Sequence, residues 1–186
     1  MIILASGSPR RAKILRDCGV EFEIVKSYAP EVSYPHDPER TVRENALAKG
    51  AAVARTLAAS APRGILSADT IVYAPETDEV LGKPKDKSDA VRMLTVLSGR
   101  THKVITGVTL RFPGGEVRSF AEVTEVTFRR LSAEEIEEYC AADEPYEKAG
   151  AYGIQGRACV FVEGICGDYF NVVGLPACKV YAELGR

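Results

Sequence analysis

Hydrophobic residues recur with two different periods along this chain, and these periods indicate where strands and helices lie. Residues 21–25 (EFEIV) alternate at every second position, as a half-buried strand does. Residues 65–74 (ILSADTIVYA) form an apolar run interrupted by one Asp-Thr pair, which indicates a buried strand. Two long β-type runs flank residues 113–115 (PGG), a sequence typical of a hairpin turn. Strands are predicted at residues 1–5, 21–25, 65–74, 103–112, 116–128 and 158–163.

Helical spacing and capping residues predict four helices. The first has Ser8 as its N-cap, Pro9 at its first position and Gly19 just past its end. The others are an alanine-rich segment, an amphipathic segment followed by a glycine, and a segment with glutamates at its positive end. These three cover residues 39–59, 87–97 and 131–142. Loops or turns are predicted at residues 27–38, 76–80 and 81–86.

Length and composition are those of one globular domain. The chain has 186 residues, 46% of them apolar and 27% charged, and one domain is the default at this length. Helices interspersed with single strands and a hairpin predict a mixed α/β architecture. The net charge of −2 gives no reason to expect nucleic acid or a membrane as partner, so any anion site must be local.

The cysteines and the N-terminus predict a cytoplasmic protein. Five cysteines are an odd number and show no metal-ligand spacing, so neither a disulfide framework nor a structural zinc is expected. This usage favours a reducing compartment. No basic region precedes a long apolar run at the N-terminus, and no apolar stretch approaches the length that spans a membrane.

The segment LASGSPRRAKIL places two arginines at the predicted start of a helix. Helix N-termini carry unpaired N–H groups and partial positive charge, so they favour anions and repel Arg10 and Arg11. A bound anion would compensate for this repulsion, with the hydroxyl groups of Ser6 and Ser8 beside it. The alternative is that the arginines are solvated or pair with acids elsewhere, and the motif alone leaves the two interpretations about even.

Two carboxylates are candidates for metal binding or catalysis. Asp69 stands within an apolar strand, where an unpaired carboxylate would be expensive to bury. It could bind a divalent cation or activate water, or it could instead cap a turn or pair with an arginine. Glu31, in the loop sequence YAPEV, could supply a second oxygen ligand, although an ordinary loop acid is the commoner explanation.

Three further polar residues suit contacts with phosphate or a base. Lys83 lies in a loop between a glycine and a proline and can reach inward, whereas Lys49 on the alanine-rich helix could equally be solvated. Gln155, between glycines, presents a donor and an acceptor together, which suits the edge of a base but also fits an ordinary turn. No GxxxxGK[ST] sequence occurs, which argues against a P-loop protein. His36 and His102 are expected to be incidental.

Together these motifs resemble the Maf family of nucleotide pyrophosphatases, also called septum formation inhibitors. The matching segments run from the first strand nearly to the C-terminus and are jointly highly specific. They are LASGSPRR (4–11), SADTIV (67–72), GKP (82–84), AVRMLTVLSGRTHKVITGV (90–108), EPYEKAGAYGIQG (144–156) and GDYFNVVGLP (167–176). The resemblance therefore covers residues 1–186 as a single Maf-like domain.

The resemblance implies hydrolysis of nucleoside triphosphates between the α- and β-phosphates, giving the monophosphate and pyrophosphate with Mg²⁺ or Mn²⁺. It implies that Asp69 accepts the proton of the attacking water and, with Glu31, binds the metal. The positions implied to bind the substrate are Ser6, Ser8, Arg10, Arg11, Lys49, Thr70, Lys83 and Gln155. Among these, Arg11, Thr70 and Gln155 match positions tied to substrate choice.

The resemblance also implies a subgroup, a fold and an assembly. Thr70 and Gln155 match the branch that acts on dTTP and UTP, so a house-cleaning hydrolase for these and for modified pyrimidine nucleotides is expected. The family fold is an elongated mixed β-sheet flanked by helices, with two lobes around a central cleft, and the family suggests a homodimer. A nucleotide-binding regulator of cell division with incidental hydrolysis is the alternative. A purine-triphosphate pyrophosphatase of related fold is a third choice.

The sequence departs from the family pattern at two places. Tyr28 and Pro30 stand where acids are common, which leaves Glu31 as the only acid of that segment. Gly50 follows Lys49 where alanine is usual. Both departures lie beside residues implied to bind the metal or the substrate.

Overall fold

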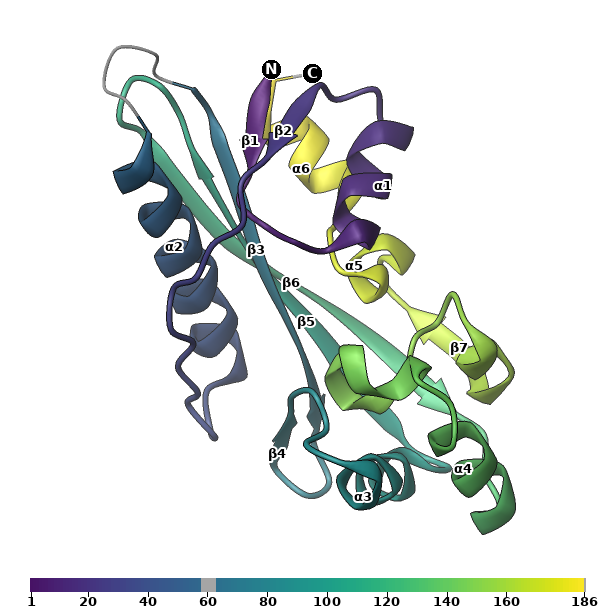
Figure 1. Cartoon of the computed structure of the whole chain (residues 1–186). Helices are drawn as coiled ribbons and strands as arrows, with labels where there is room; N and C mark the ends of the chain where they lie inside the picture. Colours follow the sequence, from purple (N-terminus) through teal and green to yellow (C-terminus); the bar gives the residue numbers. More distant parts are fainter. Residues whose placement is uncertain (58–62, 186) are drawn as a thin grey trace. The chain divides into compact units, whose positions relative to one another are not determined.

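The computed structural model describes residues 1–57 and 63–185, and its central feature is a seven-stranded sheet (Figure 1). The strand order is β2-β1-β3-β5-β6-β7, and β4 also pairs with β3. β1 is parallel to β2 and β3, whereas β4 and β7 are antiparallel to β3 and β6, so the sheet is mixed. The strands are β1 (Ile2–Leu4), β2 (Phe22–Ile24), β3 (Ile65–Ala74), β4 (Glu79–Leu81), β5 (Thr101–Arg111), β6 (Val117–Phe128) and β7 (Val162–Cys166).

Helices flank this sheet, which confirms the predicted α/β class. The α-helices of the described residues are α1 (Pro9–Asp17), α2 (Pro38–Thr56), α3 (Lys87–Leu97), α4 (Ala133–Cys140), α5 (Tyr169–Val173) and α6 (Ala177–Glu183). Three short 3₁₀ helices are η1 (Glu144–Glu147), η2 (Ala149–Ala151) and η3 (Arg157–Phe161). The four predicted helices correspond to α1 to α4. Residues 58–59 of the predicted long helix lie outside the described residues.

The strand predicted at residues 158–163 is wrong over most of its length. Residues Arg157–Phe161 form η3, and β7 begins only at Val162. Ala158 and Phe161 are buried, while the two residues between them are exposed. Burial at every third position is the period of a 3₁₀ helix, whereas a strand buries every second residue.

The turn predicted at residues 76–80 is shorter than expected. Its last two residues belong to β4, in which Val80 pairs with Tyr73 and Leu81 with Val72. Leu81 is buried by this pairing. The segment is therefore a β-hairpin, and the apolar pair at its end is the sequence signal for the missed strand.

The chain divides into two compact units. Within the described residues, the first unit comprises residues 1–57, 63–69, 106–122 and 174–185. The second comprises Thr70–Ile105 and Val123–Val173. Most of the predicted site residues, Asp69 among them, belong to the first unit.

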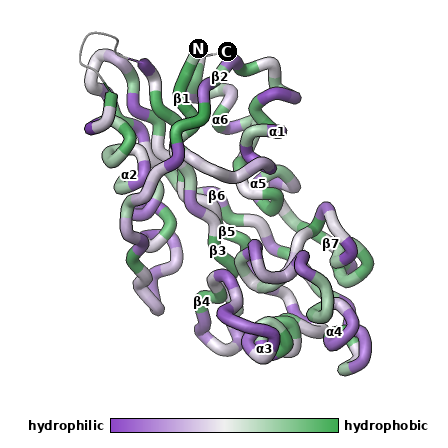
Figure 2. The backbone as a smooth tube through the Cα atoms, in the orientation of Figure 1, coloured by the Kyte–Doolittle hydropathy of each residue, from purple (hydrophilic) through white to green (hydrophobic). Residues whose placement is uncertain are grey.

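The first unit packs α2 against one face of β1 and β3. Val53 of α2 clusters with Ile3, Ala5 and Ile65, and in Figure 1 α2 and α1 lie on opposite sides of β1. Figure 2 shows β1 as hydrophobic and the connection from β2 to α2 as pale or hydrophilic. Since side chains alternate along a strand, Asp69 points to the same face of β3 as Ile65, toward α2.

Two glycines let α2 approach the sheet closely. A Cβ atom on Gly107 of β5 would lie 2.3 Å from the carbonyl oxygen of Val42. A Cβ atom on Gly50 of α2 would lie 2.7 Å from the hydroxyl of Ser67, which donates a 2.7 Å hydrogen bond to Ala46. The glycine that replaces the usual family alanine at position 50 therefore makes room for the Ser67 hydroxyl.

The second unit has an aromatic cluster around a buried histidine. The rings of His102, Phe128 and Tyr152 pack edge to face, with centroids 4.8–5.4 Å apart. The Nε2 atom of His102 lies 2.8 Å from the Tyr152 hydroxyl. Burial lowers the pKa of His102 from 6.5 to about 3. His102 is thus an uncharged core residue, which agrees with the expectation that it is incidental to chemistry.

The buried His102 predicts a loss of stability in acid. Because its folded-state pKa lies below its unfolded-state value, the unfolded chain gains a proton as the pH falls below about 6.5, and the folded chain does so only near pH 3. Between about pH 6.5 and pH 4.5 this costs roughly 2 kcal/mol of unfolding free energy. Denaturant titrations should therefore show that His102→Gln loses less stability on acidification than the natural chain. His36→Gln, at an exposed loop histidine, is the control, and equal acid sensitivity of all three proteins would contradict the assignment.

Candidate functional site

The turn between β1 and α1 is closed by its own hydroxyl groups. The Ser8 hydroxyl accepts a 3.5 Å hydrogen bond from the backbone N–H of Arg11, which confirms Ser8 as the N-cap. The Ser6 hydroxyl accepts a 3.2 Å bond from the backbone N–H of Ser8. Both serines that were predicted to bind the substrate thus already help to shape the turn.

Arg11 is bound by acceptors of the protein itself. Its Nε donates to the carbonyl of Gly174 at 2.8 Å, and its Nη1 donates to the carbonyl of Ala68 at 2.9 Å and to the Ser6 hydroxyl at 3.2 Å. Burial lowers the pKa of the Arg11 guanidinium, and the nearby Asp69 carboxylate opposes this effect. The Arg11 side chain is therefore held by backbone carbonyls, which the sequence did not suggest, with the Asp69 carboxylate nearby.

Asp69 is held by two residues that lie one turn apart on α2. Lys49 Nζ is 2.6 Å from Asp69 Oδ1, and Asn45 Nδ2 donates to Asp69 Oδ2 at 3.0 Å. The side chains of Asp69 and Lys49 are only 10% and 15% exposed. Residues four apart on a helix lie on one face, so the helical period of α2 and the alternation of β3 together bring the three side chains into contact.

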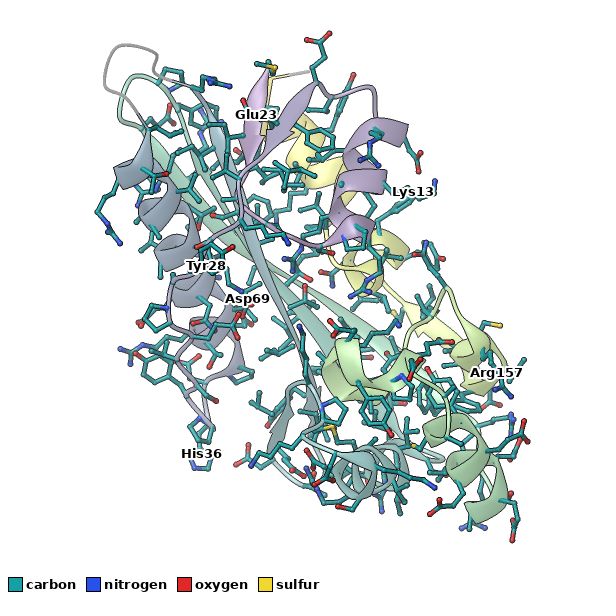
Figure 3. The ribbon with its side chains drawn as sticks, in the orientation of Figure 1. Lys13, Glu23, Tyr28, His36, Asp69 and Arg157 are labelled. Carbon is teal, nitrogen blue, oxygen red and sulfur yellow. The ribbon has the colours of Figure 1, made fainter. Side chains whose placement is uncertain are left out.

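Glu31 joins this cluster through the same ammonium group. Lys49 Nζ is 2.6 Å from Glu31 Oε1, and the Glu31 side chain is 62% exposed. The loop that carries Glu31 is fixed to α2: Asn45 bonds both backbone groups of Val32, and the Thr41 hydroxyl accepts from the N–H of Tyr34. The structure thus brings together Glu31, Lys49 and Asp69, three of the predicted site residues. His36 lies at the far end of this loop, well away from Asp69 (Figure 3).

Asn45 is the residue of this cluster that the sequence interpretation missed. It is 3% exposed and stands in the interior of a helix, on the face that also carries Val42 and Ala46. A buried polar group needs hydrogen-bond partners. An amide on the core face of α2, four residues before Lys49, is the signal that could have drawn attention to it.

Three predicted substrate-binding residues belong to the second unit. Thr70 is half-buried in β3, Lys83 Nζ lies 3.7 Å from Glu147 Oε2, and Gln155 is exposed. Gln155 stands in a turn closed by a 2.9 Å bond between the N–H of Gly156 and the carbonyl of Gly153. The roles that the sequence predicts for these three residues stay predictions.

The cluster combines two carboxylates with one ammonium group, and such groups can bind a metal ion and phosphate. Both carboxylates contact the Nζ atom of Lys49, and hard divalent cations such as Mg²⁺ prefer such oxygen donors. Residues 1–57 and 63–185 contain no cluster of three or more His, Cys, Asp or Glu side chains arranged to hold a metal ion. Mg²⁺ usually binds through one or two carboxylates together with substrate phosphates and water, so the donor set fits a cation that shares its ligands with a nucleotide.

The protein thus has a mixed α/β fold, an Asp–Lys–Glu cluster and a helix that begins with the SPRR motif. A comparison with models of known protein families identifies its class. The chain belongs to the Maf family, since the model described as Maf-like protein matches residues 1–186.

Individual proteins similar to this chain carry more specific names than the family. The chain is similar to a dTTP/UTP pyrophosphatase of Bacillus anthracis, with 47% identity over 98% of this chain and 93% of the relative. A dTTP/UTP pyrophosphatase of Bacillus cytotoxicus is 48% identical, with the same two shares covered. Among solved structures, a HAM1 protein from Coxiella burnetii has a TM-score of 0.54 and 14% identity, covering 99% of this chain and 98% of that one. This last likeness concerns the fold alone.

None of the helices in the described part of the chain has the length and apolar character needed to cross a membrane.

Proposed function

We propose that this protein hydrolyses dTTP and UTP, and modified pyrimidine nucleotides of the same kind, to the monophosphate and pyrophosphate. The observation that carries the proposal is Asp69, held between Lys49 and Asn45 with Glu31 on the same ammonium group. Membership of the Maf family and relatives named dTTP/UTP pyrophosphatase support the substrate class.

In the proposed mechanism, Asp69 accepts a proton from the water that attacks the α-phosphorus. Among the described residues, Oδ1 accepts from Lys49 and Oδ2 from Asn45, and a carboxylate oxygen has two lone pairs, so each oxygen keeps a position for water. The new bond joins the water oxygen to the α-phosphorus, and the bond to the bridging oxygen breaks, so that pyrophosphate leaves with the electron pair. Phosphoryl transfer depends mainly on positioning and charge neutralisation, and the proposal assigns these tasks to the cationic side chains of Lys49 and Arg10.

We propose that Glu31 and Asp69 hold a divalent cation, Mg²⁺ or Mn²⁺, together with the phosphate chain. When bound, such an ion neutralises phosphate charge and lowers the pKa of a coordinated water. Lys49 pairs with both of these carboxylates. With Glu31 and Asp69 engaged by a cation, the Lys49 ammonium group would be available to the triphosphate.

The test of the proposed function is pyrophosphate release from a panel of nucleotides, with and without Mg²⁺. The panel contains dTTP, UTP, 5-methyl-UTP, pseudo-UTP, CTP, ATP, GTP, ITP and 7-methyl-GTP. We expect the fastest release from dTTP and UTP, and only with the metal. Tight binding without release would favour the nucleotide-binding regulator instead. Preferred release from ITP or 7-methyl-GTP would favour a purine enzyme.

Three further features of the protein belong to this proposal. We propose that the two units form one catalytic domain, in keeping with a family model that spans both. The cytoplasm, where nucleoside triphosphates are made and used, is the proposed location. A homodimer is the assembly that the family suggests.

A further inference from the structure

The Asn45 side chain uses both hydrogens of its amide group in hydrogen bonds and is fixed in one orientation. Its Nδ2 donates to the carbonyl of Val32 and to Asp69 Oδ2, both at 3.0 Å, and its Oδ1 accepts from the N–H of Val32 at 2.8 Å. An amide NH₂ has two hydrogens, so both are used. The paired bonds to Val32 prevent the amide from flipping, because a flip would set donor against donor and acceptor against acceptor. An N–H group of Asn45 therefore always faces Asp69.

This geometry ties two parts of the cluster to one side chain. Val32 follows Glu31 directly, so the amide that orients Asp69 also fixes the backbone next to the second carboxylate. Lys49, one turn further along α2, holds the other oxygen of Asp69 and the Glu31 side chain. Asn45 is 3% exposed and both of its amide hydrogens are bonded within the protein, so we expect no contact between Asn45 and a substrate.

We propose that Asn45 is a positioning residue, which fixes the rotamer of Asp69 and its spacing from Glu31 without touching the nucleotide. The proposal rests on the proposed function, in which Asp69 must be aimed at a water molecule. A misplacement of about 1 Å can cost about 100-fold in rate. Loss of a residue that orients a metal ligand typically costs about 10- to 100-fold. The effect should fall on kcat, because substrate binding does not use Asn45.

The kinetic test compares Asn45→Ala and Asn45→Ser with Thr41→Val. Thr41 is the matched control because it is also buried on α2 and also anchors the same loop, through Tyr34, but does not contact Asp69. We expect the Asn45 variants to lower kcat for UTP about 10- to 100-fold while KM changes less than about threefold. Thr41→Val should keep kcat within about threefold. An equal loss of kcat in Thr41→Val would show that Asn45 only anchors the loop, and an unchanged kcat in the Asn45 variants would overturn the proposal.

A second measurement separates the positioning role from the reaction. The chain contains only two asparagines, Asn45 and Asn171, so a protein labelled with ¹⁵N-asparagine gives only two side-chain amide pairs in an NMR spectrum. In Asp69→Ala, hydrogen exchange at the Asn45 amide should become about fivefold faster or more, since one hydrogen bond is lost. Asn171 belongs to the other unit and is the internal reference. Unchanged exchange at Asn45 would refute the contact whether or not the protein hydrolyses UTP. A protein that shows the exchange effect but no hydrolysis would refute only the proposed function.

Discussion

Replacing Asp69 with asparagine will lower kcat for UTP hydrolysis by roughly 10²–10⁴-fold, the usual effect of removing a general base. Asparagine keeps the size of the side chain, and its carbonyl oxygen can still accept the bond from Lys49. It cannot take up a proton from water, and it offers a cation one neutral oxygen in place of a carboxylate. The measurement is steady-state pyrophosphate release with saturating Mg²⁺.

Asp17→Asn is the control for this substitution. Asp17 is an exposed aspartate at the end of α1, paired with Lys13 at 2.7 Å. Exposed ion pairs of this kind contribute little to stability, so this variant should retain the activity of the natural chain. If Asp69→Asn kept near-normal turnover of UTP, another group would have to be the base.

Gly107→Ala will destabilise the first unit by about 3 kcal/mol, at the upper end of the usual cost of overpacking. The added Cβ would lie 2.3 Å from the carbonyl oxygen of Val42 and 2.8 Å from the backbone nitrogen of Arg43. Since these are backbone atoms of α2, no side chain can turn away to make room, and the helix itself must move. Thermal unfolding should show a transition lowered by roughly 6–12 °C.

The matched control is Gly114→Ala, in the hairpin turn that follows the same strand. A Cβ at Gly114 meets nothing within 4 Å, so we expect a negligible change in stability. Because α2 carries both Asn45 and Lys49, the folded fraction of Gly107→Ala should also hydrolyse UTP more slowly. Equal melting temperatures for the two alanine variants would contradict the close packing of α2 on β5.

Local sequence signals were enough to predict the parts of the site that depend on neighbouring residues. Ser8, Pro9 and Gly19 mark the ends of α1 because capping is decided within one turn of helix. The polar interruption of the apolar strand drew attention to Asp69, since a carboxylate is expensive to bury there. Lys49 and Glu31 were candidates from their residue types, the family resemblance gave them roles, and the structure places them in one ammonium–carboxylate cluster.

The contacts that hold the site join distant parts of the chain, and this is why the sequence alone did not predict them. Asn45 reaches Asp69 across 24 positions, and Arg11 reaches Gly174 across 163. A periodic pattern shows which face of an element is buried, but not which element covers it. The sequence therefore offered a bound anion, solvent or an acid as the partner of Arg11, whereas the structure shows hydrogen bonds to backbone carbonyls.

The replacement of alanine by Gly50 illustrates the same limit. From the sequence it is only a departure from the family pattern, next to a residue of the site. In the structure a Cβ at this position would meet the Ser67 hydroxyl at 2.7 Å, so a glycine on α2 and a serine on β3 fit one another. Such a pair can be recognised only when both elements are placed.

The central claim, attack of water on the α-phosphorus with Asp69 as base, is tested most directly by hydrolysis of UTP in ¹⁸O-labelled water. Mass spectrometry of the products shows which phosphorus received the oxygen. The proposed mechanism predicts one ¹⁸O atom in UMP, unlabelled pyrophosphate, and almost no product from Asp69→Asn in the same time. Label in pyrophosphate, or UDP and phosphate as products, would contradict it.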